Sequence, residues 1–190
     1  MLEATEHSAE HSAVFADFAR EALRVLLGVT LALAWGWASF VALFDPDRTL
    51  LGYVLIAVAG LSTFAAFQLA ATRLRLAVAV FVLALFVEIS IVVIAYDNAV
   101  LLTLYLLVVL VAAPLMRPRG LGAITLLAVV ALLVIGTARA TPPVDLLIPL
   151  LLTLLAALAA WLSTRRLFTA LEWALNMTER AQRSAEEARE

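Results

Sequence analysis

Six apolar runs occupy most of this chain, and each is long enough to cross a lipid bilayer as a helix. A bilayer core about 30 Å thick requires about 20 mostly apolar residues in helical form. The connections between the runs are short, so consecutive helices are expected to form antiparallel hairpins. We therefore predict an all-α integral membrane protein with six transmembrane helices arranged as three antiparallel hairpins, at residues 25–44, 49–71, 76–95, 99–116, 121–138 and 146–163.

Composition excludes several other classes of protein. Hydrophobic residues make up 65% of the chain, and the mean hydropathy is +1.05, which a water-soluble domain of this size could not bury. The net charge is −2 and no basic cluster is present, so no nucleic-acid partner is expected. The chain has no cysteine, which excludes disulfides and thiolate metal ligands. Residues 1–24 are polar and acidic rather than signal-peptide-like, so the first span should act as its own insertion signal.

Arginine placement predicts the orientation of the spans. If the six spans alternate in direction, only Arg48 and Arg139 flank the membrane on the outer side. Positive residues accumulate on the cytoplasmic side of membrane proteins. Both termini are therefore predicted in the cytoplasm of a multi-pass cell-membrane protein. The arginines on that side are Arg20, Arg24, Arg73, Arg75, Arg117, Arg119, Arg165 and Arg166.

This topology divides the chain into three parts. Residues 1–24 form a cytoplasmic segment with an amphipathic helix that is expected to lie along the membrane surface. Residues 25–163 form the six-helix domain, and residues 164–190 form a cytoplasmic linker helix. The outer loops are too short for a folded external domain, so any sensing is expected within the bilayer or at its surface.

Glu88 is the one ionisable residue well inside a predicted span. A charged group at that depth costs about 2.5–3.5 kcal/mol even on insertion scales, so the side chain should face the bundle interior. Trp37, Tyr105 and Thr153 lie at similar depth and carry groups that can donate a hydrogen bond to the carboxylate. We predict an intramembrane site for a ligand, an ion or a proton. The alternative is a neutral carboxylic acid that ties two helices together.

Small residues recur at four-residue spacing in three of the spans, where they allow helices to approach closely in lipid. The first span contains Gly28, Ala32 and Gly36, which is a candidate homodimer face. Packing within the chain is the preferred interpretation of all three stripes. The other two are Ala66 with Ala70 and Ala156 with Ala160.

The polar tail after the sixth span repeats at the heptad spacing of a coiled coil. No glycine or proline lies between Leu150 and Glu190, so the helix can continue from the membrane into the cytoplasm. A homodimer through this seam is predicted, and the alternative is a solvated helix. The seam positions are Leu171, Ala174, Thr178, Ala181, Ala185 and Ala188.

Residues 141–190 resemble the last membrane helix and exit linker of bacterial multi-span sensor histidine kinases of two-component systems. The similar elements are the LEWA sequence at Leu171–Ala174 and the linker ending in ARE. The resemblance implies a bacterial inner-membrane protein. In that family the phosphoacceptor histidine and the ATP-binding domain follow the linker. The histidines here, His7 and His11, are at the opposite end of the chain, so we expect an input region without kinase activity.

The leading hypothesis is a membrane-embedded sensory and dimerisation module that relays rearrangement within the bilayer to the C-terminal helix and to a cytoplasmic signalling domain or protein. The alternatives are a small transporter or channel-like protein that uses Glu88, and a non-catalytic accessory membrane subunit. The sequence contains no phosphate-binding glycine loop, no catalytic triad and no zinc-binding pattern. We therefore expect no enzymatic activity, no cofactor and no metal. The expected partners are the lipid bilayer and a second copy of the chain.

Overall fold

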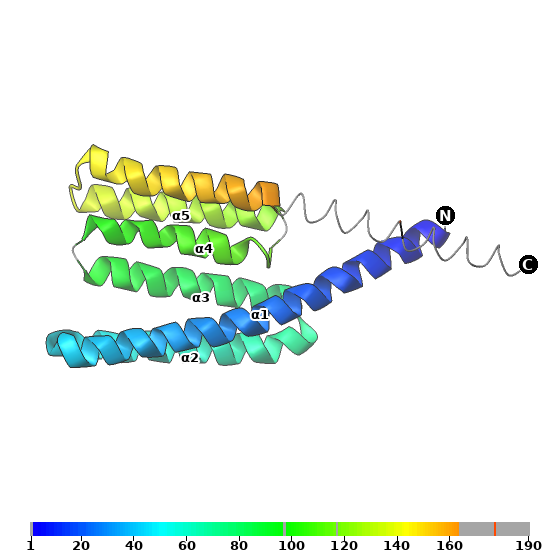
Figure 1. Cartoon of the computed structure of the whole chain (residues 1–190), viewed down its shortest axis with the longest axis horizontal. Coiled ribbons are helices and arrows are strands. Elements are labelled where there is room, and N and C mark those ends of the chain that lie inside the picture. Colours follow the sequence, from blue (N-terminus) through cyan, green and yellow to red (C-terminus); the bar gives the residue numbers. More distant parts are fainter. Residues whose placement is uncertain (1, 97, 117, 164–176, 178–190) are drawn as a thin grey trace, which may run out of the picture.

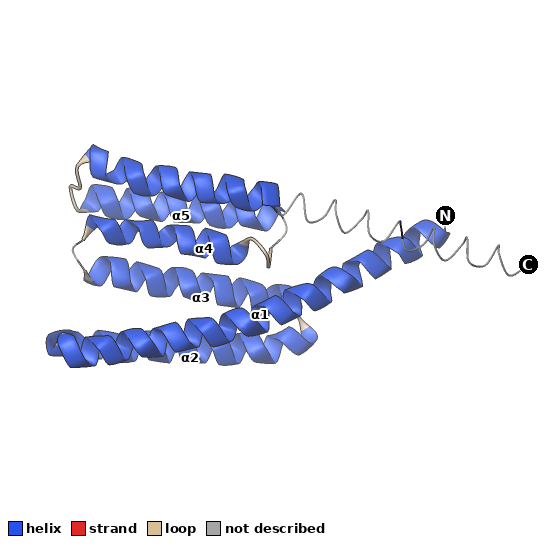
Figure 2. Ribbon diagram, viewed as in Figure 1, coloured by secondary structure: helices blue, strands red, loops and turns tan. Residues whose placement is uncertain are grey.

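The computed structural model describes residues 2–96, 98–116, 118–163 and 177, with side chains from residue 19 onward. Within these ranges the chain is helical and contains no strand (Figure 2). The elements are α1 (Leu2–Phe44), the 3₁₀ helix η1 (Pro46–Arg48), α2 (Thr49–Thr72), α3 (Leu74–Ala95), the 3₁₀ helix η2 (Ala99–Leu104), α4 (Tyr105–Ala112), α5 (Pro118–Ala138) and a last helix (Pro143–Ser163).

Five helices are long and apolar enough to cross a membrane, which confirms a multi-pass, all-α membrane protein. The five segments are 21 to 27 residues long. The first of them is the part of α1 from residue 19 onward. They correspond to the predicted spans at 25–44, 49–71, 76–95, 121–138 and 146–163. The boundaries differ from the predictions by a few residues, except that helical structure extends upstream of the first span.

The fourth predicted span, residues 99–116, is shorter than expected. The apolar helix covers only Ala99–Ala112 and begins as the 3₁₀ helix η2. A 3₁₀ helix rises about 2.0 Å per residue and an α-helix about 1.5 Å, so the 14 residues extend about 24 Å. The regular helix thus ends four residues before the predicted end of the span at 116. The chain turns after Ala112 because Pro114 has no N–H to continue the helical hydrogen bonds.

Successive helices pack beside one another along the chain (Figure 1). Helices α1 and α2 lie on one side of α3, and α4, α5 and the last helix lie on the other. The N-terminal end of α1 and the end of the last helix lie at the same end of the bundle. The chain therefore enters and leaves the described bundle on one side.

Helix α1 is one continuous element of 43 residues. At about 1.5 Å per residue it is roughly 65 Å long, twice the thickness of a bilayer core. Its N-terminal part extends away from the other helices (Figure 1). The predicted segment 1–24 is thus not a separate helix.

Small residues allow close contacts at two helix pairs. A Cβ added at Gly52 of α2 would lie 3.3 Å from the Cα of Ala38 in α1. A Cβ added at Gly136 of α5 would overlap the side chain of Leu146 in the last helix. At Gly52 the close neighbour is the backbone of α1, whereas at Gly136 it is the end of a leucine side chain that can change rotamer.

The predicted stripes of small residues differ in whether they are buried. In the second and sixth spans, Ala66, Ala70 and Ala160 are buried, and Ala156 is half-buried. In α1, Gly28, Ala32 and Gly36 are all exposed, and a Cβ added at either glycine would meet no atom within 4 Å. The preferred interpretation of the α1 stripe, packing within the chain, is therefore wrong. The buried face of α1 is instead marked by Leu23, Leu27, Ala38 and Val41.

The end of α5 adopts a tight helix-stop geometry. Ala140 has a φ of 52°, its N–H bonds the carbonyl of Thr137, and the N–H of Thr141 bonds the carbonyl of Gly136. This is the Schellman arrangement, in which glycine is usual at the left-handed position. The connection then enters the last helix through Pro142 and Pro143, which suit the first turn of a helix.

Candidate functional site

Glu88 lies in α3, seven residues before the helix ends at Ala95. Its side chain is buried, with 8% of the residue exposed. The Oε1 atom is fully buried and has no hydrogen-bond partner. A polar atom buried in this way costs free energy unless a ligand, an ion, a proton or a water molecule supplies the missing partner.

Tyr105 is fully buried, but its hydroxyl group is directed to a different face of α3 from Glu88. The hydroxyl lies 2.9 Å from Oγ of Ser90, and the ring packs against Phe86 with 5.6 Å between centroids. Phe86 and Ser90 are each two residues from Glu88, which is a rotation of about 200° around the helix. The predicted hydrogen bond from Tyr105 to Glu88 is therefore absent.

Thr153 and Trp37 are also engaged elsewhere. Oγ1 of Thr153 donates to the carbonyl of Pro149 in its own helix at 2.8 Å. Trp37 is 37% exposed, and its ring meets Tyr96 edge-on at 5.9 Å and Phe40 at 6.2 Å. The four predicted site residues share a depth in the bundle, but the structure does not bring them together, because depth does not determine which way a side chain points.

The face of α3 that carries Glu88 also carries Ala77 and Phe81, both fully buried. These positions are eleven and seven residues before Glu88, which places each of them within about 20° of Glu88 around the helix axis. Helix α3 contacts α1, α2, α4 and α5, and Glu88 points away from the Tyr105 contact on α4. Helices α1 and α2 therefore cover the Glu88 face.

Thr63 in α2 is the residue that sequence reasoning missed. Its Oγ1 atom is buried and, like Oε1 of Glu88, has no hydrogen-bond partner. Helices α2 and α3 form a hairpin about Arg73, with Thr63 ten residues before it and Glu88 fifteen after it. Their depths thus differ by five residues, or about 7.5 Å. The α2–α3 hairpin contains two buried, unpartnered side-chain oxygens on facing helices. In the sequence, the available signal was that Thr63 is in helical phase with Ala59, Ala66 and Ala70.

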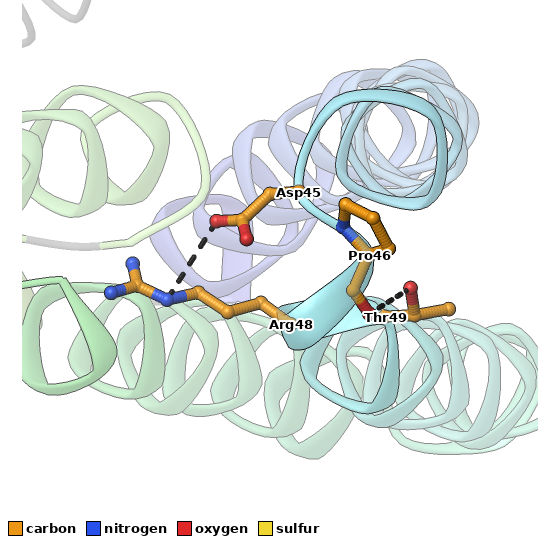
Figure 3. Close-up of polar contacts among 4 residues, drawn as sticks. All are labelled: Asp45, Pro46, Arg48 and Thr49. Atoms are coloured by element: carbon orange, nitrogen blue, oxygen red, sulfur yellow. Dashed lines mark hydrogen bonds and ion pairs between the residues drawn. The ribbon is translucent and has the colours of Figure 1, made fainter.

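The end of the bundle that carries the α1–α2 turn holds a compact polar group (Figure 3). Nε of Arg48 lies 3.7 Å from Oδ2 of Asp45, and the Thr49 hydroxyl donates to the carbonyl of Pro46 at 2.8 Å. The Arg48 guanidinium also lies 4.3 Å from the centre of the Tyr96 ring, at the C-terminal end of α3. This cation–π contact holds η1 against α3.

Arg139, the second arginine at this end, also reaches α3. Its Nη2 donates to the carbonyl of Val93, in the last turn of α3, while Nη1 is buried without a partner. The C-terminal end of a helix carries partial negative charge and attracts cations. Arg48 and Arg139 are the two arginines that the predicted topology places on the outer side. Both contact the C-terminal end of α3.

The described ranges contain no group of three or more histidine, cysteine, aspartate or glutamate side chains placed to hold a metal ion. The predicted tail seam, from Leu171 to Ala188, lies outside the described residues, as do Arg165 and Arg166. No family model, no curated protein and no solved structure matches this chain.

Proposed function

We propose that this protein is the membrane-embedded sensory and dimerisation module of a bacterial signal-transduction protein. In this proposal, a rearrangement of the bundle around Glu88 passes through the last helix to the tail and on to a cytoplasmic signalling domain or protein. The observation that carries the proposal is the buried, unpartnered Oε1 atom of Glu88. A bound proton, ion or ligand at such an atom changes the relative stability of two helix packings, as a switch requires.

The proposal includes six crossings with both termini in the cytoplasm. The crossing added to the five long helices is the fourth in chain order, Ala99–Ala112. Its extent of about 24 Å, together with the turn that follows, approaches the thickness of the bilayer core. Entry and exit of the chain at one end of the bundle support an even number of crossings (Figure 1). Eight arginines on that side against two on the other support the cytoplasmic assignment.

Two alternatives receive less support. A transporter or channel requires several polar groups along a path through the membrane. Among the described residues, the buried polar or charged ones are Glu88 and Thr153, and the hydroxyl of Thr153 is bonded within its own helix. An accessory subunit would use the tail only as an anchor, so the helical phase of the tail would not matter to its partner.

Dimerisation is the second part of the proposal. The exposed stripe of Gly28, Ala32 and Gly36 lets a second helix approach closely, as small residues do in membrane helix pairs. The predicted heptad seam of the tail supplies a second contact between the same two copies in the cytoplasm. The two contacts together would join the membrane bundle to the output helix.

Disulfide crosslinking of single-cysteine variants tests the proposal, because the natural chain has no cysteine. Cysteines are placed one at a time through residues 171–188 and oxidised in native membranes. Crosslinked dimer should peak at seam positions such as Ala174 and Ala181 and fall at the positions between them. A flat profile, or no dimer at any position, would contradict the dimeric output helix.

The same scan repeated with Glu88→Gln tests the sensing role. Glutamine keeps the size of the side chain but cannot lose a proton, so the ratio of crosslinking rates along the seam should change. Thr153→Val is the matched control, since it alters a buried polar group that is already bonded, and its profile should equal that of the parent. An unchanged profile in Glu88→Gln would reject Glu88 as the sensing group. One residue inserted after Arg166 should shift the peaks if the tail continues the last helix.

A further inference from the structure

An open groove of about 380 Å³ runs between α5 and the last helix. It lies in the half of the membrane that the proposed topology assigns to the cytoplasmic leaflet, since α5 begins and the last helix ends there. Its walls are almost entirely apolar, and the lining includes Pro118, Gly122, Thr125, Leu126, Val129 and Trp161.

The groove offers nothing to a polar ligand. The one hydroxyl group in its lining belongs to Thr125, and this group donates to the carbonyl of Leu121 at 2.8 Å. Along α5 the lining extends from Pro118 to Val129, which is about 16 Å of helix. Half of a bilayer core is about 15 Å thick. The groove thus matches the hydrocarbon part of one leaflet in both chemistry and length.

A cation directly follows Pro118, the lining residue at one end of the groove on α5. Arg119 is exposed and follows Pro118 in the first turn of α5, which contains no acidic residue. It precedes Leu126, a lining residue, by seven positions, so the two side chains leave the helix about 20° apart. The N-terminal end of a helix also attracts anions. The groove and Arg119 together fit a molecule with an apolar chain and an anionic head.

We propose that this groove binds one anionic phospholipid of the cytoplasmic leaflet, with an acyl chain between α5 and the last helix and the headgroup phosphate at Arg119. The site does not involve Glu88, and its placement in the cytoplasmic leaflet rests on the topology proposed above. It would couple the lipid composition of the membrane to the contact between α5 and the last helix, which leads directly into the tail.

Fluorescence quenching by brominated lipids tests the site directly. The protein is prepared with Trp161 as its one tryptophan, by changing Trp35, Trp37 and Trp173 to phenylalanine, and is placed in bilayers of phosphatidylcholine. Brominated phosphatidylglycerol or brominated phosphatidylcholine is then added as the probe. The anionic lipid should bind about fivefold more tightly, as expected for one arginine near an anionic headgroup. Equal quenching by the two lipids would overturn the headgroup assignment.

Two variants test the headgroup contact and the acyl-chain groove separately. Arg119→Gln should reduce the preference for phosphatidylglycerol to about onefold. Gly122→Leu should reduce quenching by both lipids, because Gly122 lines the groove and a Cβ added there would meet no atom within 4 Å. Gly60→Leu in α2 is the matched control, since its Cβ also meets nothing within 4 Å, and it should leave quenching unchanged. Parent-like quenching in Gly122→Leu, with the helical circular dichroism of the parent, would show ordinary surrounding lipid and overturn the proposal.

Discussion

The two halves of the bundle differ in whether their buried side-chain oxygens have hydrogen-bond partners. In the half made of α4, α5 and the last helix, Tyr105 is bonded to Ser90 and Thr153 to its own backbone. In the α2–α3 hairpin, Glu88 and Thr63 each bury an oxygen that has no partner. No other buried side-chain oxygen in the described part of the chain lacks one. Burial at a given depth therefore does not distinguish these side chains, whereas the state of their hydrogen bonds does.

The largest expected change in the free energy of unfolding comes from removing a buried side chain whose hydrogen bond is made. Tyr105→Ala leaves a cavity and deprives Ser90 of a partner, so the free energy of unfolding should fall by about 3–5 kcal/mol. Tyr105→Phe keeps the ring against Phe86 and should lose only about 1 kcal/mol. Unfolding by sodium dodecyl sulfate in mixed micelles, followed by circular dichroism, measures both. Equal losses in the two variants would show that the hydroxyl rather than the ring holds α4 to α3.

A substitution at Glu88 is expected to raise the free energy of unfolding rather than lower it. Leucine fills similar space without an unmet hydrogen bond, so Glu88→Leu should raise the free energy of unfolding by about 1–3 kcal/mol. The same unfolding experiment applies. A loss of more than about 1 kcal/mol would mean that the carboxyl group is a structural tie between helices, and the contrast between the two halves would fail.

The smallest effects come from one substitution made on each side of the comparison. Thr63→Val removes an unpartnered hydroxyl and should raise the free energy of unfolding by about 1 kcal/mol. Thr153→Val removes a hydroxyl bonded to the carbonyl of Pro149 and should lower it by about 0.5 kcal/mol. Because the chemical change is identical, a difference in the sign of the change in unfolding free energy reports whether the hydroxyl group was hydrogen-bonded. The same sign in both variants would break the comparison.

The candidate site was only partly predictable. Glu88 was identified from its depth alone, and its burial is confirmed. Its supposed partners were chosen by depth as well, and their polar groups are engaged elsewhere. Tyr105 contacts Ser90, which leaves α3 about 200° around the helix axis from Glu88. Thr63 was missed because a threonine in an apolar helix usually bonds its own backbone, as Thr153 does.

The amino-acid sequence by itself determined the class of the protein, the approximate extent of its long helices and the small-residue contacts at Ala66, Ala70 and Ala160. These follow from hydropathy and residue size. Tertiary structure decided which face of each helix is buried, which left Gly28 and Gly36 outside and gave the 3₁₀ start to the fourth apolar helix. The physical reason is that lipid is as apolar as the core. The membrane-spanning helices are therefore apolar all round, and only packing and hydrogen bonding determine which side turns inward.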